Sequence, residues 1–306
     1  MEKNRKKTWI IIGSIAIVAI VAVCLIIVFS RDKKEAYRLI KVFELDGRAT
    51  ISRKEIGDID AYSNMVLESG DTVFQNEGTM TLKLDEDKYV YVEEQTKFSL
   101  VATGSSANSK TTIELEQGAI TSEIKNKLPA DATYEINTPN SSMSVRGTIY
   151  RVYTYIGEDG IKYSVVAVFD GTVSTRLRYA DGSMDDKEVE VGKGKQITIY
   201  EDAETTDYLT DVEDIDYSKI PEDVLLNLIE ISENGTDLSL TTDELKALLE
   251  KGPYTVTFLY NGTVFGTQTV LNGAYAQVPT LSPAASGKWD FDFSTPITED
   301  TEIHWN

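Results

Sequence analysis

The feature that most limits how this chain can fold is an uninterrupted apolar segment near its N-terminus, residues 8–29. It follows a basic stretch that contains Lys3, Arg5, Lys6 and Lys7. As a helix, the apolar segment would be roughly 33 Å long, which is enough to cross the hydrocarbon core of a bilayer once. No second apolar segment of similar length follows. The sequence therefore predicts one transmembrane anchor and a large polar body.

A cleaved signal peptide is the alternative interpretation of this segment. The segment is longer than the usual apolar core of such a peptide, and residues 30–34 follow it without a small-residue cleavage site. A lipoprotein signal at Cys24 is also disfavoured, because Val23 stands where such signals need a small residue. We therefore predict that the anchor is retained.

The orientation of the anchor follows from the layout of the chain, since basic residues lie on both sides of it and do not decide the direction. Residues 1–7 form a tail too short to fold, whereas a long polar chain follows the span. This order is typical of an exported protein. We predict a single-pass protein of the cell membrane, with a cytoplasmic N-terminus and extracytoplasmic C-terminal domains.

Charge and residue usage exclude several classes of function. The formal net charge is −20, so phosphates would be repelled and nucleic acid is not an expected partner. The only cysteine, Cys24, lies in the apolar segment, and the only histidine, His304, lies near the C-terminus in a strand-like pattern. Cysteine nucleophiles, cysteine metal sites and histidine-based triads are therefore not expected in the body. We predict no catalytic residues, no metal site and no small-molecule cofactor.

An enzyme that hydrolyses glycans with paired carboxylates is the remaining catalytic alternative. The chain has 50 acidic residues, so some pairs lie close by chance, as Asp290 and Asp292 do in the sequence. Such proximity carries almost no diagnostic weight. The chain is predicted not to be an enzyme.

Residues 37–200 have the pattern of a β domain. Apolar and polar residues alternate in short segments, for example at residues 80–84, 89–92 and 113–116. Glycines such as Gly118 and Gly171 stand between the segments, where tight turns are needed. No long helical pattern interrupts them, so the predicted fold class is mainly β.

Within about residues 38–200 the order of the segments resembles the FecR-type domain. The similarity is strongest at residues 136–139, 143–148 and 150–153, with supporting segments at 67–71 and 168–173. The resemblance implies a β domain, which could close as a β-sandwich or stack as a solenoid-like array. It also implies a set of structural signature residues: Thr138, Pro139, Arg146, Gly147, Thr148 and Gly171.

Arg146 needs a partner, because it lies in an alternating segment between Val145 and Gly147. It could hold a carboxylate or carbonyl groups within the sheet, or it could recognise an external anion. We favour the structural role, since buried arginines are normally paired within the fold.

Residues 201–252 are predicted to be an acidic linker with two short helices. Acidic side chains dominate residues 201–223, although the ligand spacing of a calcium loop is missing. Pro221 suits the first position of one helix, and Thr241 with Glu244 forms a capping-box pattern at the start of the other. The two helices are expected to act as a spacer.

The C-terminal residues 253–306 are again β-rich and resemble the internalin B repeat family, which implies a small β-grasp-like module. The resemblance rests on residues 254–258, the pair Asn261–Gly262 and residues 289–305, and the pair also predicts a type I′ hairpin by itself. The aromatic positions of the pattern could stack on sugar rings, but core packing is the preferred interpretation because their period of two places them on one face. The signature residues of this module are Trp289 and Trp305.

Two functions are therefore expected. The main hypothesis is a single-pass bacterial envelope protein with a non-catalytic ectodomain that binds or scaffolds a protein or a cell-wall glycan outside the cell. The alternative is a transmembrane sensor related to FecR-type regulators. In the known FecR arrangement a cytoplasmic segment engages a sigma factor, whereas residues 1–7 are too short for this. Output would therefore pass through a partner protein.

Overall fold

The computed structural model describes residues 39–105, 108–145, 147–249, 253–271 and 273–306. Residues 37–306 belong to one compact unit. The predicted tail, residues 1–7, and the predicted anchor, residues 8–29, lie outside the described residues. Within the part that is described, no helix combines the length and the apolar character needed to span a membrane.

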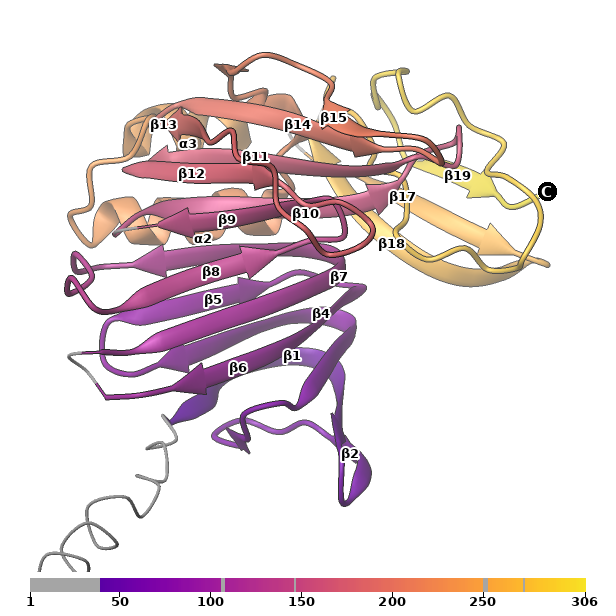
Figure 1. The fold of residues 1–306 in the computed structure, drawn as a ribbon. Coiled ribbons are helices and arrows are strands. Elements are labelled where there is room, and N and C mark those ends of the chain that lie inside the picture. Colours follow the sequence, from indigo (N-terminus) through magenta and orange to yellow (C-terminus); the bar gives the residue numbers. More distant parts are fainter. Residues whose placement is uncertain (1–38, 106–107, 146, 250–252, 272) are drawn as a thin grey trace, which may run out of the picture. The chain divides into compact units, whose positions relative to one another are not determined.

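The described body is mainly β, which confirms the fold class expected from the alternating pattern (Figure 1). Its large sheet contains strands β1 (Ile40–Arg53), β2 (Gly57–Asp60), β3 (Val66–Leu67), β4 (Thr72–Leu84), β5 (Lys88–Val92), β6 (Thr96–Thr103), β7 (Lys110–Ile124), β8 (Thr133–Asn137), β9 (Ser141–Val145), β10 (Ile149–Ile156), β11 (Lys162–Asp170), β12 (Thr172–Leu177), β13 (Val189–Gly192), β14 (Lys195–Glu201), β15 (Thr206–Tyr208) and β16 (Glu213–Asp214).

Strand β7 divides this sheet into two layers. Its first part, residues 110–117, pairs with β6 and β8, whereas residues 118–124 pair with β5 and β10. Gly118 stands at the junction with a φ of +84°, and a Cβ atom there would clash with Thr96. One layer continues through β9, β12 and β13, and the other through β11 and β14.

The two layers enclose one hydrophobic core. Because side chains alternate between the faces of a strand, every second residue of β5, β7 and β10 points inward. Val90, Val92, Tyr150 and Val152 are fully buried in this way. The residues between them point to the outer face of the β5–β7–β10–β11 layer, and this outer face carries the site described below.

Two helices cover that outer face, as Figure 1 shows behind β9, β10 and β11. They are α2 (Glu222–Glu233) and α3 (Thr242–Leu249), preceded by a 3-10 turn at Tyr217–Lys219. Val224, Leu225 and Leu228 of α2 share a second hydrophobic core with Ile149 and Phe169 of the sheet. The capping box of α3 is formed, since Glu244 N donates to Thr241 Oγ1 at 3.3 Å and Thr241 N donates to Glu244 Oε2 at 2.8 Å.

The first part of the predicted acidic linker differs from the expectation. Residues 206–208 and 213–214 form β15 and β16, and both strands pair with β14. Lys195 of β14 binds Asp214 at 2.6 Å, so an acidic side chain finds a basic partner across the strand pair. Short, charged strands are a common way to finish the edge of a sheet. The sequence indicated a linker because acidic residues dominate residues 201–223, and composition does not reveal the pairing with β14.

The C-terminal residues form a separate three-stranded sheet in the order β18–β17–β19, from β17 (Pro253–Tyr260), β18 (Thr263–Leu271) and β19 (Thr301–His304). Strands β17 and β18 are antiparallel, whereas β17 and β19 are parallel. Asn261 and Gly262 both have positive φ, at 50° and 74°, as the predicted type I′ turn requires.

The aromatic segment that begins at Trp289 is not a strand, which corrects the period-of-two interpretation. Trp289 forms only an isolated bridge with Trp305, and the segment turns at residues 293–294. Trp289 nevertheless packs edge-on against Phe258, with ring centroids 5.1 Å apart, and Phe293 stacks on Phe258 at 6.3 Å. The aromatic rings therefore fill the core of this module from a looped backbone.

A candidate binding cleft on the outer face of the sheet

An ion pair is buried on the outer face of the large sheet. Arg151 of β10 donates from Nε and Nη2 to the two carboxylate oxygens of Glu93, both at 2.7 Å. Glu93 follows β5 directly, and β5 and β10 both flank β7, so the two side chains reach each other across one strand. Only 6% of Glu93 and 3% of Arg151 is exposed. This is the planar, two-bond geometry in which arginine binds carboxylates most strongly.

Burial and mutual attraction act against each other in this pair. Burial raises the pKa of Glu93, and the neighbouring Arg151 guanidinium limits that rise. For Arg151, burial favours loss of the proton, but the charge and hydrogen bonds of Glu93 outweigh it and raise the pKa. Each group therefore depends on its partner to remain charged inside the protein.

A segment of the C-terminal module lies over this pair. Gln277 Oε1 accepts from Arg151 Nη2 at 3.5 Å, and Tyr153 of β10 donates to the carbonyl oxygen of Val278 at 2.9 Å. Thr280 donates from Oγ1 to the carbonyl oxygen of Gln95 at 3.2 Å. Residues 277–280 thus connect the C-terminal module to the sheet and its loops through three polar contacts. A fourth, from Gln277 Nε2 to the carbonyl oxygen of Lys219 at 2.8 Å, reaches the 3-10 turn before α2.

Helix α2 contributes a second polar contact to the same face. The hydroxyl of Tyr91, on β5, donates to Asp223 at 3.1 Å. Burial, followed by the charge of Asp223, raises the pKa of Tyr91 well above its ordinary value, so the phenol stays protonated. Asp223 lies in the first turn of α2 and is thereby fixed beside the sheet.

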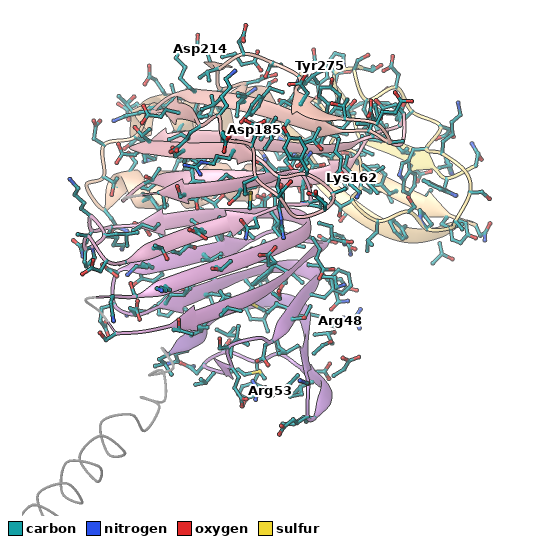
Figure 2. All side chains as sticks on the ribbon, viewed as in Figure 1. Arg48, Arg53, Lys162, Asp185, Asp214 and Tyr275 are labelled. Carbon is teal, nitrogen blue, oxygen red and sulfur yellow. The ribbon has the colours of Figure 1, made fainter. Side chains whose placement is uncertain are left out.

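The sheet, α2 and β18 leave a cleft of about 370 Å³ between them. Tyr275, labelled in Figure 2, lies at this cleft, and the ammonium group of Lys219 is 5.9 Å from the centre of its ring. A smaller hollow of about 80 Å³ adjoins it, lined by Tyr153, Phe265 and residues 277–280. The larger cleft is lined by Gly78, Thr79, Glu93, Glu94, Ser218, Lys219, Ile220, Pro221, Glu222, Asp223, Leu226, Thr267, Gln268, Thr269, Val270, Leu271, Ala274, Tyr275 and Gln277.

The chemistry of these walls suits recognition. They present carboxylates, amides and hydroxyls beside apolar side chains, a combination that binding sites use. Among the described residues, no group of three or more histidine, cysteine, aspartate or glutamate side chains is arranged to hold a metal ion. The cleft is therefore our candidate site for a partner.

The signature residue Thr138 lies away from the cleft, in a buried network of hydroxyl groups. Its Oγ1 accepts from Ser164 at 3.0 Å and donates to Asn140 Oδ1, also at 3.0 Å. Pro139 lies between Thr138 and Asn140 in the turn that joins β8 to β9, where its missing N–H costs no ladder hydrogen bond. This turn is thereby tied to β11.

The signature residues Gly147, Thr148 and Gly171 meet at one point of the sheet. Gly171 has a φ of +81°, and a Cβ atom there would lie 2.8 Å from the carbonyl oxygen of Gly147 and 2.9 Å from Thr148 Oγ1. Thr148 Oγ1 also donates to the carbonyl oxygen of Thr172 at 3.2 Å. Arg146 lies outside the described residues, so the two roles considered for it stay predictions.

Trp289 and Trp305 lie together in the C-terminal module, with ring centroids 5.1 Å apart and planes at 78°. Gly287 allows this arrangement, because a Cβ atom there would clash with the indole of Trp305. Trp289 is only 5% exposed. These rings therefore belong to the core of the module, and they do not line the cleft.

The sequence analysis missed Glu93 and Arg151. The only signal was their outward position: Glu93 follows Tyr91 and Val92, and Arg151 stands between Tyr150 and Val152 in an alternating strand. Such positions normally face solvent. Here Gln277, which is 126 residues away from Arg151 along the chain, contacts the pair from the outside.

Comparison with known proteins identifies part of this body. Residues 71–174 match the family model described as FecR protein, so the chain contains a FecR domain. This range includes Glu93, Arg151 and the signature residues from Thr138 to Gly171. No curated protein sequence matches the chain significantly.

Two solved structures show a distant likeness. Both are crystal structures of a "putative anti-sigma factor" from Parabacteroides distasonis ATCC 8503, and each is 12% identical to this chain. The first has a TM-score of 0.40 and covers 77% of this chain and 98% of its own; the second has a TM-score of 0.38 and covers 76% and 97%.

Proposed function

We propose, from the FecR domain at residues 71–174, that this protein is a membrane-anchored sensor that relays a signal to a partner protein. Residues 8–29 hold it in the cell membrane, and the described body lies outside the cytoplasm. The match to the FecR family is the observation that carries the proposal. In the FecR arrangement the outer domain senses a partner, and here the outer domain carries a cleft at which a partner could bind.

The position of the cleft suits a sensor. Its walls come from the FecR domain, from α2 and from β18, so one bound partner would contact three parts of the body at once. A ligand shifts a conformational equilibrium only by its differential affinity for the two states. A partner that binds better when the three parts are docked would therefore favour the docked state.

A non-catalytic binding or scaffolding ectodomain is the second candidate function. The C-terminal module favours it, because residues 253–306 resemble the internalin B repeat found on bacterial surfaces. On this proposal the module and the FecR domain together hold a protein or a cell-wall glycan outside the cell. Neither candidate requires a cofactor, a metal ion or an enzymatic reaction.

The two candidates differ in what the anchor does. We would place a photoreactive amino acid at Ile20 and compare the natural span with a version in which residues 8–29 are shuffled. Shuffling keeps the length and the hydropathy of the span but changes the surface it offers to a partner helix. For a relay, we expect one membrane protein to be cross-linked to the natural span and the yield to fall at least tenfold with the shuffled span.

The control for this comparison is the amount of each version in the membrane, which should be equal. Equal cross-linking of the same proteins by both spans, at equal abundance, would refute the relay and leave the scaffold.

A further inference from the structure

We propose that the free edge of β18, together with the acidic cleft, binds an extended basic peptide segment by adding it to the sheet as a further strand. The peptide segment would belong to the partner that the protein senses, and this part of the proposal rests on the proposed function. Its physical basis is independent of signalling. It depends on an open strand edge, a cleft beside that edge and the charge of the cleft walls.

The edge of β18 is open. In the order β18–β17–β19, β18 pairs with β17 only. Over the described residues, the backbone groups of 264–270 make no hydrogen bond other than those to β17. An unpaired edge of this kind is a template for another strand, and several peptide-binding domains take their ligands in this way.

Part of this edge lacks the features that usually block strand addition. Proteins protect edges with lysine, proline or bulges. β18 has one bulge, at Phe265, where the register with β17 shifts. The four residues beyond it, Gly266–Thr269, carry no charge and no proline, and Thr267 and Thr269 are exposed. Four residues of strand extend over about 14 Å, enough to pair with a short peptide segment.

The open edge faces the cleft. Thr267, Gln268 and Thr269 line it, opposite the first turn of α2 and the residue pair Gly78–Thr79. Gln268 is held in place, because its side chain bonds both the N–H and the carbonyl oxygen of Gln277 at 2.8 Å. The segment after β18 is thereby fixed beside the edge without pairing to it. Because side chains alternate between the two faces of a strand, every second side chain of a peptide strand added to β18 would enter the cleft.

The charge of the cleft selects the peptide. Glu94, Glu222 and Asp223 line it, and none of the three takes part in an ion pair within the described residues. Lys219 is the basic residue that opposes them, and it already pairs with Asp216 at 3.4 Å. Glu93 is neutralised by Arg151. Lysine or arginine side chains of a bound peptide would supply the missing positive charge.

A second copy of the chain could also pair with the open edge of β18, but electrostatic repulsion disfavours it. Each chain carries a formal net charge of −20, so two acidic surfaces would have to approach each other. Edge-to-edge pairing of two copies would also bring the acidic cleft walls together. A basic peptide meets neither obstacle.

The test measures peptide binding to the full-length protein in detergent micelles by fluorescence anisotropy. The probe is a fluorescein-labelled hexapeptide of alternating lysine and valine with blocked ends. Two matched peptides serve as controls, one with glutamate in place of lysine and one with every valine amide N-methylated. We expect saturable binding of the lysine peptide, at least tenfold weaker binding of the glutamate peptide, and loss of binding on N-methylation.

Two matched variants locate the site on β18. Thr267→Lys places a positive charge on the open edge inside the cleft, and we expect it to weaken binding of the lysine peptide about tenfold. Thr263→Lys makes the same change on an exposed residue of the same strand that does not line the cleft. We expect this control to change the affinity less than twofold.

Four outcomes would overturn the inference. They are the absence of saturation, equal binding of the N-methylated peptide, equal effects of the two lysine variants, and a concentration-dependent dimer that Thr267→Lys disrupts. The last would assign the edge to a second copy. Because the measurement uses purified protein and involves no partner of the anchor, its failure would leave the cross-linking result at Ile20 unaffected.

Discussion

Arg151→Met is expected to lower the free energy of unfolding of the body by about 3–5 kcal/mol, because it leaves the carboxylate of Glu93 buried without its partner. Glu93 is only 6% exposed, so water would solvate its unpaired carboxylate poorly. Methionine keeps the apolar stem of arginine, so the loss reflects mainly the removal of the guanidinium group with its charge and its two hydrogen bonds. Urea unfolding of the full-length protein, followed by tryptophan fluorescence, measures the difference.

Arg176→Met is the matched control. Arg176 also binds a glutamate, Glu188, at 2.6 Å, but about half of its side chain is exposed. Exposed pairs of this kind contribute less than about 1 kcal/mol. A loss at Arg151 no larger than the loss at Arg176 would show that the buried pair contributes no more to stability than an exposed pair.

The pH dependence of Arg151→Met provides a second check. Burial raises the pKa of Glu93, and in the variant the opposing effect of Arg151 is gone. A group whose pKa is raised on folding stabilises the protein below its unfolded value and loses that contribution as the pH rises through its folded value. The loss of unfolding free energy caused by Arg151→Met should therefore be smaller at about pH 5 than at about pH 8. A deficit that is independent of pH would contradict this account of Glu93.

Gly171→Ala is expected to lower the free energy of unfolding by about 2–4 kcal/mol. This loss is the sum of two contributions, the left-handed backbone of a non-glycine residue and a close contact with Gly147 and Thr148. A Cβ atom at Gly171 would lie 2.8 Å from the carbonyl oxygen of Gly147 and 3.2 Å from Thr148 Cα. These neighbours are backbone atoms, so they cannot move aside as a flexible side chain would. Thermal unfolding of the full-length variant measures the cost.

Gly182→Ala separates the two contributions to this cost. Gly182 has nearly the same φ, +83°, but a Cβ atom there would have no neighbour within 4 Å. This variant should therefore lose only the backbone contribution of about 1–2 kcal/mol. Equal losses for the two variants would mean that the contact between Gly147, Thr148 and Gly171 carries no packing constraint.

The local features of the fold could be predicted because short-range physics determines them. Alternation identifies buried strands such as β5, the Asn261–Gly262 pair identifies a hairpin, and Thr241 with Glu244 identifies the start of α3. Each of these signals acts within about four residues. The mainly β class follows from their sum.

The errors arise where one segment depends on another that is distant in sequence. Residues 206–208 and 213–214 have the composition of a linker, but the open edge of β14 makes them strands. The aromatic segment that begins at Trp289 has the alternation of a strand, but contacts with Phe258 and Trp305 hold it as a loop.

The candidate site belongs to this second group. Glu93 and Arg151 alternate outward as solvent-facing residues do, but segments distant in sequence, such as the one that contains Gln277, lie over them. The cleft likewise forms between segments from three parts of the chain. A pattern within one sequence does not predict such an arrangement. The FecR signature around Thr138 could be recognised because its residues are close together in the sequence.

The location of the body relative to the membrane is the most direct test of the central claim, that a membrane-anchored FecR domain senses a partner outside the cytoplasm. Cys24 is the only native cysteine, so Cys24→Ala combined with Glu158→Cys leaves one thiol, at an exposed position of the loop between β10 and β11. We would treat spheroplasts with a membrane-impermeant maleimide, with a denatured sample to confirm thiol access. The account predicts labelling without lysis of the cytoplasmic membrane. Labelling only after lysis would place the body in the cytoplasm and contradict it.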